Sequence, residues 1–194
     1  MILAIDTSSA RSAMGLVDPG SERVEELQFD SRETPVAMQF AHISKGVRLT
    51  KIAVATGPGS FTGVRAGVSF GLGLAIGLRI PIVPLPTLAI QAARSGEPVL
   101  AVSEAGRGRV YYLPPGGGEP AVGEPRELPS DHEVVGWLRP QTERSMAAAG
   151  LRFRPETQLA RWIEGARKLL ETAREVPYRN LEIEYMQSFS APRK

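Results

Sequence analysis

The segment best suited to ligand chemistry is a glycine-rich run, GPGSFTG, at positions 57–63. It stands between an apolar run at 51–55, which predicts a buried strand, and a longer apolar stretch at 64–78, which predicts a helix. Amide N–H groups at a helix N-terminus attract anions, so this loop could hold a phosphate. Glycines in such a loop could equally serve a tight turn alone. The candidate phosphate-binding residues are Gly57, Gly59, Ser60, Thr62 and Gly63.

A carboxylate at a strand end is the second feature that could do chemistry. Asp6 follows the apolar run at 2–5 and precedes Thr7 and Ser8. At the edge of a buried strand, Asp6 could bind a metal-bound nucleotide or orient a water molecule. It could also cap the polar turn that follows it, which would be a structural role. Asp6, Thr7 and Ser8 therefore join the candidate nucleotide site.

The sequence offers no pattern for catalysis by this chain alone. It contains no cysteine, which excludes thiolate nucleophiles and cysteine-bound zinc. His42 and His132 are far apart, and neither has a second ligand at metal spacing. Ser103 ends a predicted strand, but no base can be identified for it. We therefore expect no catalytic residue and no metal site.

Composition indicates a globular protein. The 194 residues are 42% hydrophobic, and the net charge of +2 does not indicate broad binding to nucleic acid. The apolar stretch at 64–78 is shorter than the ~20 residues that a membrane span needs. The first residues do not have the pattern of a signal peptide. We expect a cytoplasmic protein with no membrane partner.

The predicted helix at 64–78 carries glycines that recur four residues apart. Each glycine inside a helix costs about 1 kcal/mol relative to alanine, so close packing must offset that cost. The close neighbour could be the protein's own core or another subunit, and the sequence favours neither. The candidate interface residues are Arg65, Gly67, Val68, Gly71, Leu72, Ala75 and Ile76.

Apolar runs and turn residues predict two successive α/β lobes, at 1–97 and 98–194. In the first, a strand, loop, helix and strand in succession indicate parallel pairing. Its strands are expected at 2–5, 13–17, 24–29, 51–55 and 81–85, and its helices at 35–45, 64–78 and 87–95, the last capped by Thr87. The smaller second lobe should contain strands at 99–103, 109–113 and 146–149, a short helix at 134–138 behind a capping box of Ser130 and Glu133, a long helix at 157–173 and a tail.

Several motifs, taken in order, closely resemble the TsaB (YeaZ) family. They are IDTS at 5–8, GPGSFTGVRAG at 57–67, IPIV at 80–83 followed by Thr87 and Leu88, EAGRGRVY at 104–111 and LEIEYMQ at 181–187. The second motif is highly specific, and the resemblance spans nearly the whole chain. It implies an α/β fold of two actin/Hsp70-like (RNase H-like) lobes, with mixed sheets flanked by helices.

The resemblance also implies a function. TsaB-like proteins pair with a catalytic TsaD-like paralogue and recruit a TsaE-like ATPase, in the bacterial complex that forms N6-threonylcarbamoyladenosine at position 37 of tRNAs reading codons that begin with A. We therefore expect a non-catalytic scaffold or activator subunit that meets tRNA through the complex and forms a homodimer when alone. The resemblance gives no certain cofactor for this chain, and it allows ATP or ADP with Mg²⁺ at the level of the complex. The alternative is a small-molecule kinase or ATPase that uses Asp6 and the loop at 57–63. A peptidase has the least support.

Overall fold

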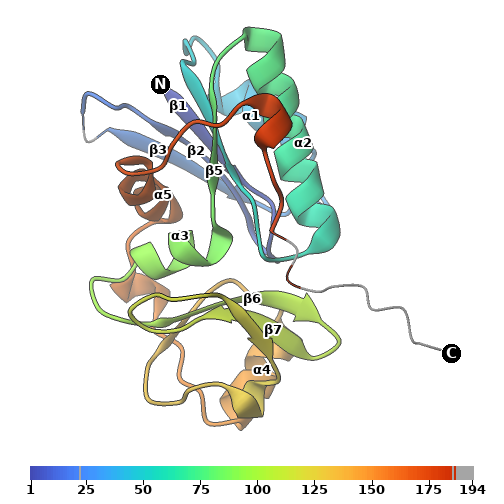
Figure 1. The fold of residues 1–194 in the computed structure, drawn as a ribbon, viewed down its shortest axis with the longest axis vertical. Helices are drawn as coiled ribbons and strands as arrows, with labels where there is room; N and C mark the ends of the chain where they lie inside the picture. The colour runs from blue at the N-terminus through green and yellow to red at the C-terminus, as the bar shows by residue number, and fades with distance from the viewer. Residues whose placement is uncertain (22, 185, 187–194) are drawn as a thin grey trace, which may run out of the picture.

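The first sheet has five strands in the order β3-β2-β1-β4-β5. The computed structural model describes residues 1–21, 23–184 and 186 (Figure 1). β1, β2 and β3 form an antiparallel meander, whereas β4 pairs in parallel with both β1 and β5, as the sequence predicts. The strands are β1 Ile2–Asp6, β2 Ser12–Val17, β3 Val24–Phe29, β4 Lys51–Ala55 and β5 Ile82–Leu85.

Helices cover both faces of this sheet, because apolar side chains along its strands point alternately to each side. Leu3 and Ile5 of β1 join the cluster that includes α1 and α2, whereas Ile2 and Ala4 join the one that includes α3 and α5. Figure 1 shows these pairs of helices on opposite sides of the strands. The helices are α1 Val36–Ile43, α2 Phe61–Leu78, α3 Thr87–Ala93 and α5 Trp162–Leu170.

The glycines of α2 lie on two different faces of the helix. A Cβ atom on Gly67 would stand 2.5 Å from Thr7 Oγ1, and one on Gly71 would stand 2.3 Å from Val54 Cγ1. Real Cβ atoms do not approach other atoms so closely, so both positions need glycine for α2 to rest on the first sheet. The close neighbour that these two glycines require is therefore the protein's own core.

The outer face of α2 is the part that a partner could reach. Gly73 and Gly77 have nothing within 4 Å of a Cβ position, and Ile76 beside them is 51% exposed. The predicted partner interface is thus wrong for four residues, because they lie on the helix face that meets the sheet. The buried four are Gly67, Val68, Gly71 and Ala75, while Arg65 and Ile76 are exposed and Leu72 is partly exposed.

α2 also bears on the membrane expectation. Its 18 residues make it, among the described residues, one helix long and apolar enough to cross a membrane. Core helices of soluble proteins pass the same test, so a single helix of this kind is weak evidence for a span. The contacts of Gly67 and Gly71 show that one face of α2 packs on the first sheet, although only 28% of the helix is buried.

The second sheet has four strands in the order β8-β7-β6-β9, with β9 parallel to β6 and the other pairs antiparallel. α4 covers one face through Met146. α3 covers the other through Leu88, while Ile90 of the same helix packs into the first lobe. The elements are β6 Leu100–Gly106, β7 Arg109–Leu113, β8 Ala121–Gly123, β9 Val134–Val135, α4 Pro140–Ala148 and the 3₁₀ turns η1 Pro125–Glu127, η2 Glu156–Gln158 and η3 Tyr178–Asn180.

Three predictions for the second half of the chain are wrong. The helix expected at 134–138 is replaced by the short strand β9, because Val134 and Val135 pair with β6. The strand expected at 146–149 is the end of α4 and its cap. The helix expected at 157–173 is reduced to η2 and α5, because Leu159 between them adopts an extended backbone.

The chain returns to the first sheet after the second lobe. α5 packs on the first sheet, Val176 bridges Ile82 of β5, and the amide of Glu184 donates to Thr56 O at 2.9 Å. The boundary near residue 97 separates the two sheets. The assignment of residues 162–184 to the second lobe is wrong, because the apolar face of α5 is buried against the first.

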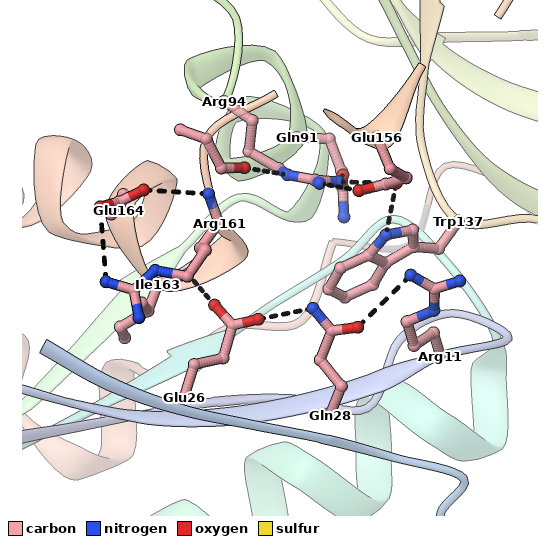
Figure 2. Close-up of polar contacts among 11 residues, drawn as sticks. Arg11, Glu26, Gln28, Gln91, Arg94, Trp137, Glu156, Arg161, Ile163 and Glu164 are labelled. Atoms are coloured by element: carbon pink, nitrogen blue, oxygen red, sulfur yellow. Dashed lines mark hydrogen bonds and ion pairs between the residues drawn. The ribbon is translucent and has the colours of Figure 1, made fainter. Parts of the chain in front are cut away.

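A tryptophan clamp joins the two lobes (Figure 2). Trp137, just after β9, is 3% exposed, and its Nε1 donates to Glu156 Oε1 at 3.1 Å. The guanidinium carbons of Arg11 and Arg94 lie 5.4 and 5.2 Å from the Trp137 ring centroid, within cation–π range. Arg94 also forms an ion pair with Glu156. Because Arg11 belongs to the first lobe and Trp137 to the second, these contacts hold the lobes in one orientation.

Replacing glycine by alanine should have opposite effects on stability at the two faces of α2. Gly71→Ala should lower the free energy of unfolding by about 1–3 kcal/mol, because the added methyl overlaps Val54. Gly73→Ala should raise it by up to ~1 kcal/mol, because its methyl meets open space and alanine favours the helix. Urea unfolding followed by circular dichroism measures both. Effects of the same sign would contradict this assignment of the faces.

The clamp predicts a cost for losing the indole N–H. Trp137→Phe should lower the free energy of unfolding by about 1–2 kcal/mol, since it removes the hydrogen bond to Glu156 and weakens the cation–π contacts. Denaturant titration measures this, with Met38→Leu at an exposed position as the control. Equal stabilities of the Trp137→Phe and wild-type proteins would show that the clamp contributes nothing.

Candidate functional site

A cavity of about 750 Å³ lies between the two lobes. Its walls come from the turn after β1, the segment before α1, the glycine-rich loop, the β6–β7 turn and the chain around Glu184. Three of the candidate nucleotide-binding residues, Asp6, Ser8 and Gly57, do not line it. The candidates that do line it are Thr7, Gly59, Ser60, Thr62 and Gly63.

The carboxylate of Asp6 is buried behind the cavity wall. Its Oδ1 accepts hydrogen bonds from the amide and the hydroxyl of Ser8, at 2.8 and 2.6 Å. Its Oδ2 accepts one from Trp162 Nε1 at 3.2 Å. Burial raises the pKa of Asp6, and these hydrogen bonds oppose the rise. Asp6 therefore links β1 to the turn that follows it and to α5. This is the structural role that the sequence offered as the alternative to nucleotide binding.

Hydroxyl groups connect Asp6 with the glycine-rich loop. The amide of Gly57 donates to Thr87 Oγ1 at 3.1 Å, and Thr87 Oγ1 donates in turn to Ser8 Oγ at 3.2 Å. Ser8 Oγ then donates to Asp6 Oδ1. The predicted capping role of Thr87 is wrong, because it is the first residue of α3 and its side chain serves this chain of hydrogen bonds instead.

The glycine-rich loop rests directly on the turn after β1. A Cβ on Gly59 would stand 2.4 Å from Ser8 O, and one on Gly63 would stand 2.0 Å from Thr7 O. The amide of Ser60 donates to Ser8 O at 2.7 Å, and Thr7 Oγ1 donates to Gly63 O at 2.6 Å. The side chain of Ser60 caps α2 by accepting from Gly63 N at 3.3 Å, so α2 begins three residues before the predicted position 64. Much of the loop's hydrogen-bonding capacity is thus used inside the protein.

The end of β6 supplies the facing wall of the cavity. Ser103 Oγ donates to Pro58 O at 2.8 Å, so this serine links the second lobe to the loop. Glu104 accepts hydrogen bonds from the amide and the guanidinium of Arg139, at 2.8 and 2.7 Å. Burial alone would raise the pKa of Glu104, but the hydrogen bonds from Arg139 and Thr142 outweigh it and lower the pKa.

Sequence reasoning missed four charged residues of this cavity: Asp30, Arg32, Arg139 and Glu184. Asp30 and Arg32 form an ion pair that lowers the pKa of Asp30 to about 2. Their spacing of two residues after a predicted strand was a usable signal. Arg139 gave no such signal, because its partner Glu104 is 35 residues away in the chain.

The groups predicted to hold a nucleotide with Mg²⁺ are largely engaged inside the protein. The amides of Gly57, Ser60 and Gly63 already have partners, and Asp6 is sealed behind the wall. Within the part of the chain that the structure describes, no three His, Asp or Glu side chains are grouped to hold a metal ion. The hydrogen bonds of the loop therefore favour a structural role for it over phosphate binding.

Comparison with known proteins shows similarity to tRNA-modification proteins. The family model described as TsaD, tRNA N6-adenosine threonylcarbamoyltransferase, matches residues 33–121. The tRNA threonylcarbamoyladenosine biosynthesis protein TsaB of Escherichia coli is 35% identical over 57% of this chain and 53% of its own length. TsaB of Bacillus subtilis is 36% identical over 57% of this chain and 52% of its own length. The chain thus spans about half the length of the curated relatives it matches.

A solved structure matches over most of the chain. YeaZ from Pseudomonas aeruginosa aligns with a TM-score of 0.71 and 23% identity, over 95% of this chain and 99% of that one. The match confirms the predicted fold class, two α/β lobes with mixed sheets flanked by helices. The curated relatives, over 57% of this chain, confirm the resemblance that the sequence motifs indicated. Of the motif at 181–187, Tyr185 and Gln187 lie outside the described residues.

The Glu104–Arg139 pair predicts a pH-dependent stability. Glu104→Gln should lower the free energy of unfolding at pH 7 by about 1–2 kcal/mol, since Arg139 loses a charged acceptor. The pKa of Glu104 is lowered on folding, so its contribution is complete above the unfolded value of 4.5 and fades as the pH falls through the folded value. Urea titrations at pH 7 and near pH 3 should show the deficit of the variant shrinking in acid. A deficit that stays constant would contradict the ion-pair role.

Proposed function

We propose that this chain, a relative of the TsaB (YeaZ) proteins, is a non-catalytic subunit of the bacterial machinery that forms N6-threonylcarbamoyladenosine at position 37 of tRNAs reading codons that begin with A. It acts by pairing with a TsaD-like paralogue. The names of the matched relatives and of the family model support this role. The structural observation that carries it is the apolar, uncovered face of α1 and α2.

That face combines exposed apolar side chains with positions that lack side chains. Gly73 and Gly77 leave room for another backbone to come close to α2. Each apolar side chain that a partner buries contributes on the order of 1–2 kcal/mol, given that about half of it is accessible at the start. The exposed apolar residues of the two helices are Met38 at 64%, Phe61 at 46%, Ile76 at 51% and Leu78 at 50%, of which Phe61 also lines the interlobe cavity.

A scaffold role also agrees with the state of the polar groups. Both carboxylate oxygens of Asp6 accept hydrogen bonds, from Ser8 and Trp162. The hydroxyl of Ser103 donates to a backbone carbonyl. Neither group is placed to act on a substrate. The alternative, a kinase or ATPase that uses Asp6 and the loop at 57–63, loses support because Asp6 does not line the cavity.

The proposal has further parts that concern the assembly. The complex includes a TsaE-like ATPase, and any ATP or ADP with Mg²⁺ is bound there rather than by this chain alone. A net charge of +2 gives little reason for a broad tRNA-binding surface, so tRNA is met through the complex. In the absence of the paralogue, the α1–α2 face joins two copies of this chain. The complex works in the cytoplasm.

A charge on the outer face of α2 tests the pairing. Ile76→Glu should weaken co-purification with the TsaD-like paralogue of the same organism by at least about tenfold, because the new charge would have to be desolvated in the interface. Thr172→Glu, an exposed position just after α5 and therefore on the opposite side of the first sheet, is the matched control and should have no effect.

Depletion of the protein tests the pathway itself. Mass spectrometry of tRNA nucleosides should show loss of N6-threonylcarbamoyladenosine, restored by the wild-type chain and by Thr172→Glu but not by Ile76→Glu. An unchanged nucleoside level, together with no recovery of the paralogue in pull-downs, would sink the proposal.

A further inference from the structure

The charges around the interlobe cavity are paired, with one exception among the described residues. Arg32 Nη2 lies 2.5 Å from a carboxylate oxygen of Asp30, and Arg139 Nη2 lies 2.7 Å from one of Glu104. These two pairs leave the cavity without a net charge of their own. Glu184 also lines the cavity, and its one side-chain partner in the described part of the chain is a hydroxyl rather than a cation.

The backbone fixes the position of Glu184, but among the described residues no cation compensates the charge of its carboxylate. The amide of Glu184 donates to Thr56 O at 2.9 Å, and its carbonyl lies against Gly57. The carboxylate accepts one long hydrogen bond, from Thr56 Oγ1 at 3.5 Å. Partial burial raises the pKa of Glu184, as expected for a charged form that lacks a partner.

Apolar side chains make up part of the cavity lining. A cavity of about 750 Å³ is large enough for a small ligand or for a long side chain of another protein. A polyphosphate would place more negative charge beside Glu184, whereas a cation would compensate it. The apolar lining residues include Val36, Phe61, Val64, Tyr111 and Ile183.

We infer that this cavity binds an ammonium or guanidinium group carried on an apolar stem, with Glu184 as its counter-ion. The stem packs against apolar walls such as Phe61 and Ile183, and the charged end reaches the carboxylate. Such a group is supplied either by a free amine or by a lysine or arginine side chain of a protein partner. The binding itself concerns the isolated chain, and only the choice between these two sources rests on the proposed function.

The test uses n-butylguanidinium, a guanidinium on a four-carbon stem, and the isolated full chain. NMR should show saturable shifts of the amide signals of cavity glycines such as Gly59, Gly63 and Gly106, with affinity in the millimolar range. Glu184→Gln should weaken binding at least about tenfold, which is 1.4 kcal/mol. Glu182→Gln, which removes an exposed carboxylate two residues away, is the matched control and should bind like wild type.

Two further measurements complete the test. One distinguishes the contribution of the charge from that of the apolar stem, and the other distinguishes the two possible sources of the cation. n-Butanol has the same stem without the charge and should not bind. If saturating TsaD-like paralogue displaces n-butylguanidinium, the source is a side chain of the partner. If the paralogue and n-butylguanidinium bind at the same time, the source is a free amine. Equal binding by wild type and Glu184→Gln would overturn the inference. Glycine shifts that appear with ATP but not with n-butylguanidinium, or no shifts with either, would also overturn it.

Discussion

The fold depends on the close approach of the glycine-rich loop to the turn after β1. At Gly59 and Gly63 the backbones are so near that any side chain would overlap a carbonyl oxygen. That approach lets the hydroxyl of Ser8 bond to both Thr87 and Asp6, and lets Asp6 accept from Trp162. One backbone contact thus brings β1, α2, α3 and α5 together, which explains why hydroxyl-bearing residues and glycines concentrate in these two segments.

The first lobe was predictable from the sequence because its signals are local. Val24–Phe29 and Lys51–Ala55 match the predicted strands at both ends, since turn residues delimit each apolar run. The strand at 109–113 in the second half was also predicted correctly, but other parts of this half were not, because distant partners decide their structure. Val134 and Val135 become a strand only by pairing with β6. Apolar residues at helical spacing continue through residues 157–173. The helix is nevertheless interrupted at Leu159, whose backbone is extended, and no local sequence signal marks this break.

The cavity shows the same division between local and distant information. The loop residues that line it were evident from their glycines and hydroxyls. Glu184 was not, because 128 residues separate it from Thr56. For α2, the spacing of its glycines showed that some neighbour must come close, but only the tertiary structure shows that Gly71 meets the sheet and Gly73 meets solvent. Periodicity identifies a face and leaves the identity of its neighbour open.

The position of α3 has a consequence for how the molecule unfolds. This helix of seven residues contributes Ile90 to the core of one sheet and Leu88 to that of the other. Neither sheet keeps a sealed core once α3 is released, so water would enter both at the same moment. The lobes are separate in their strand pairing but form a single cooperative unit in thermodynamic terms. A chain cut between them would yield fragments that each lack part of their interior.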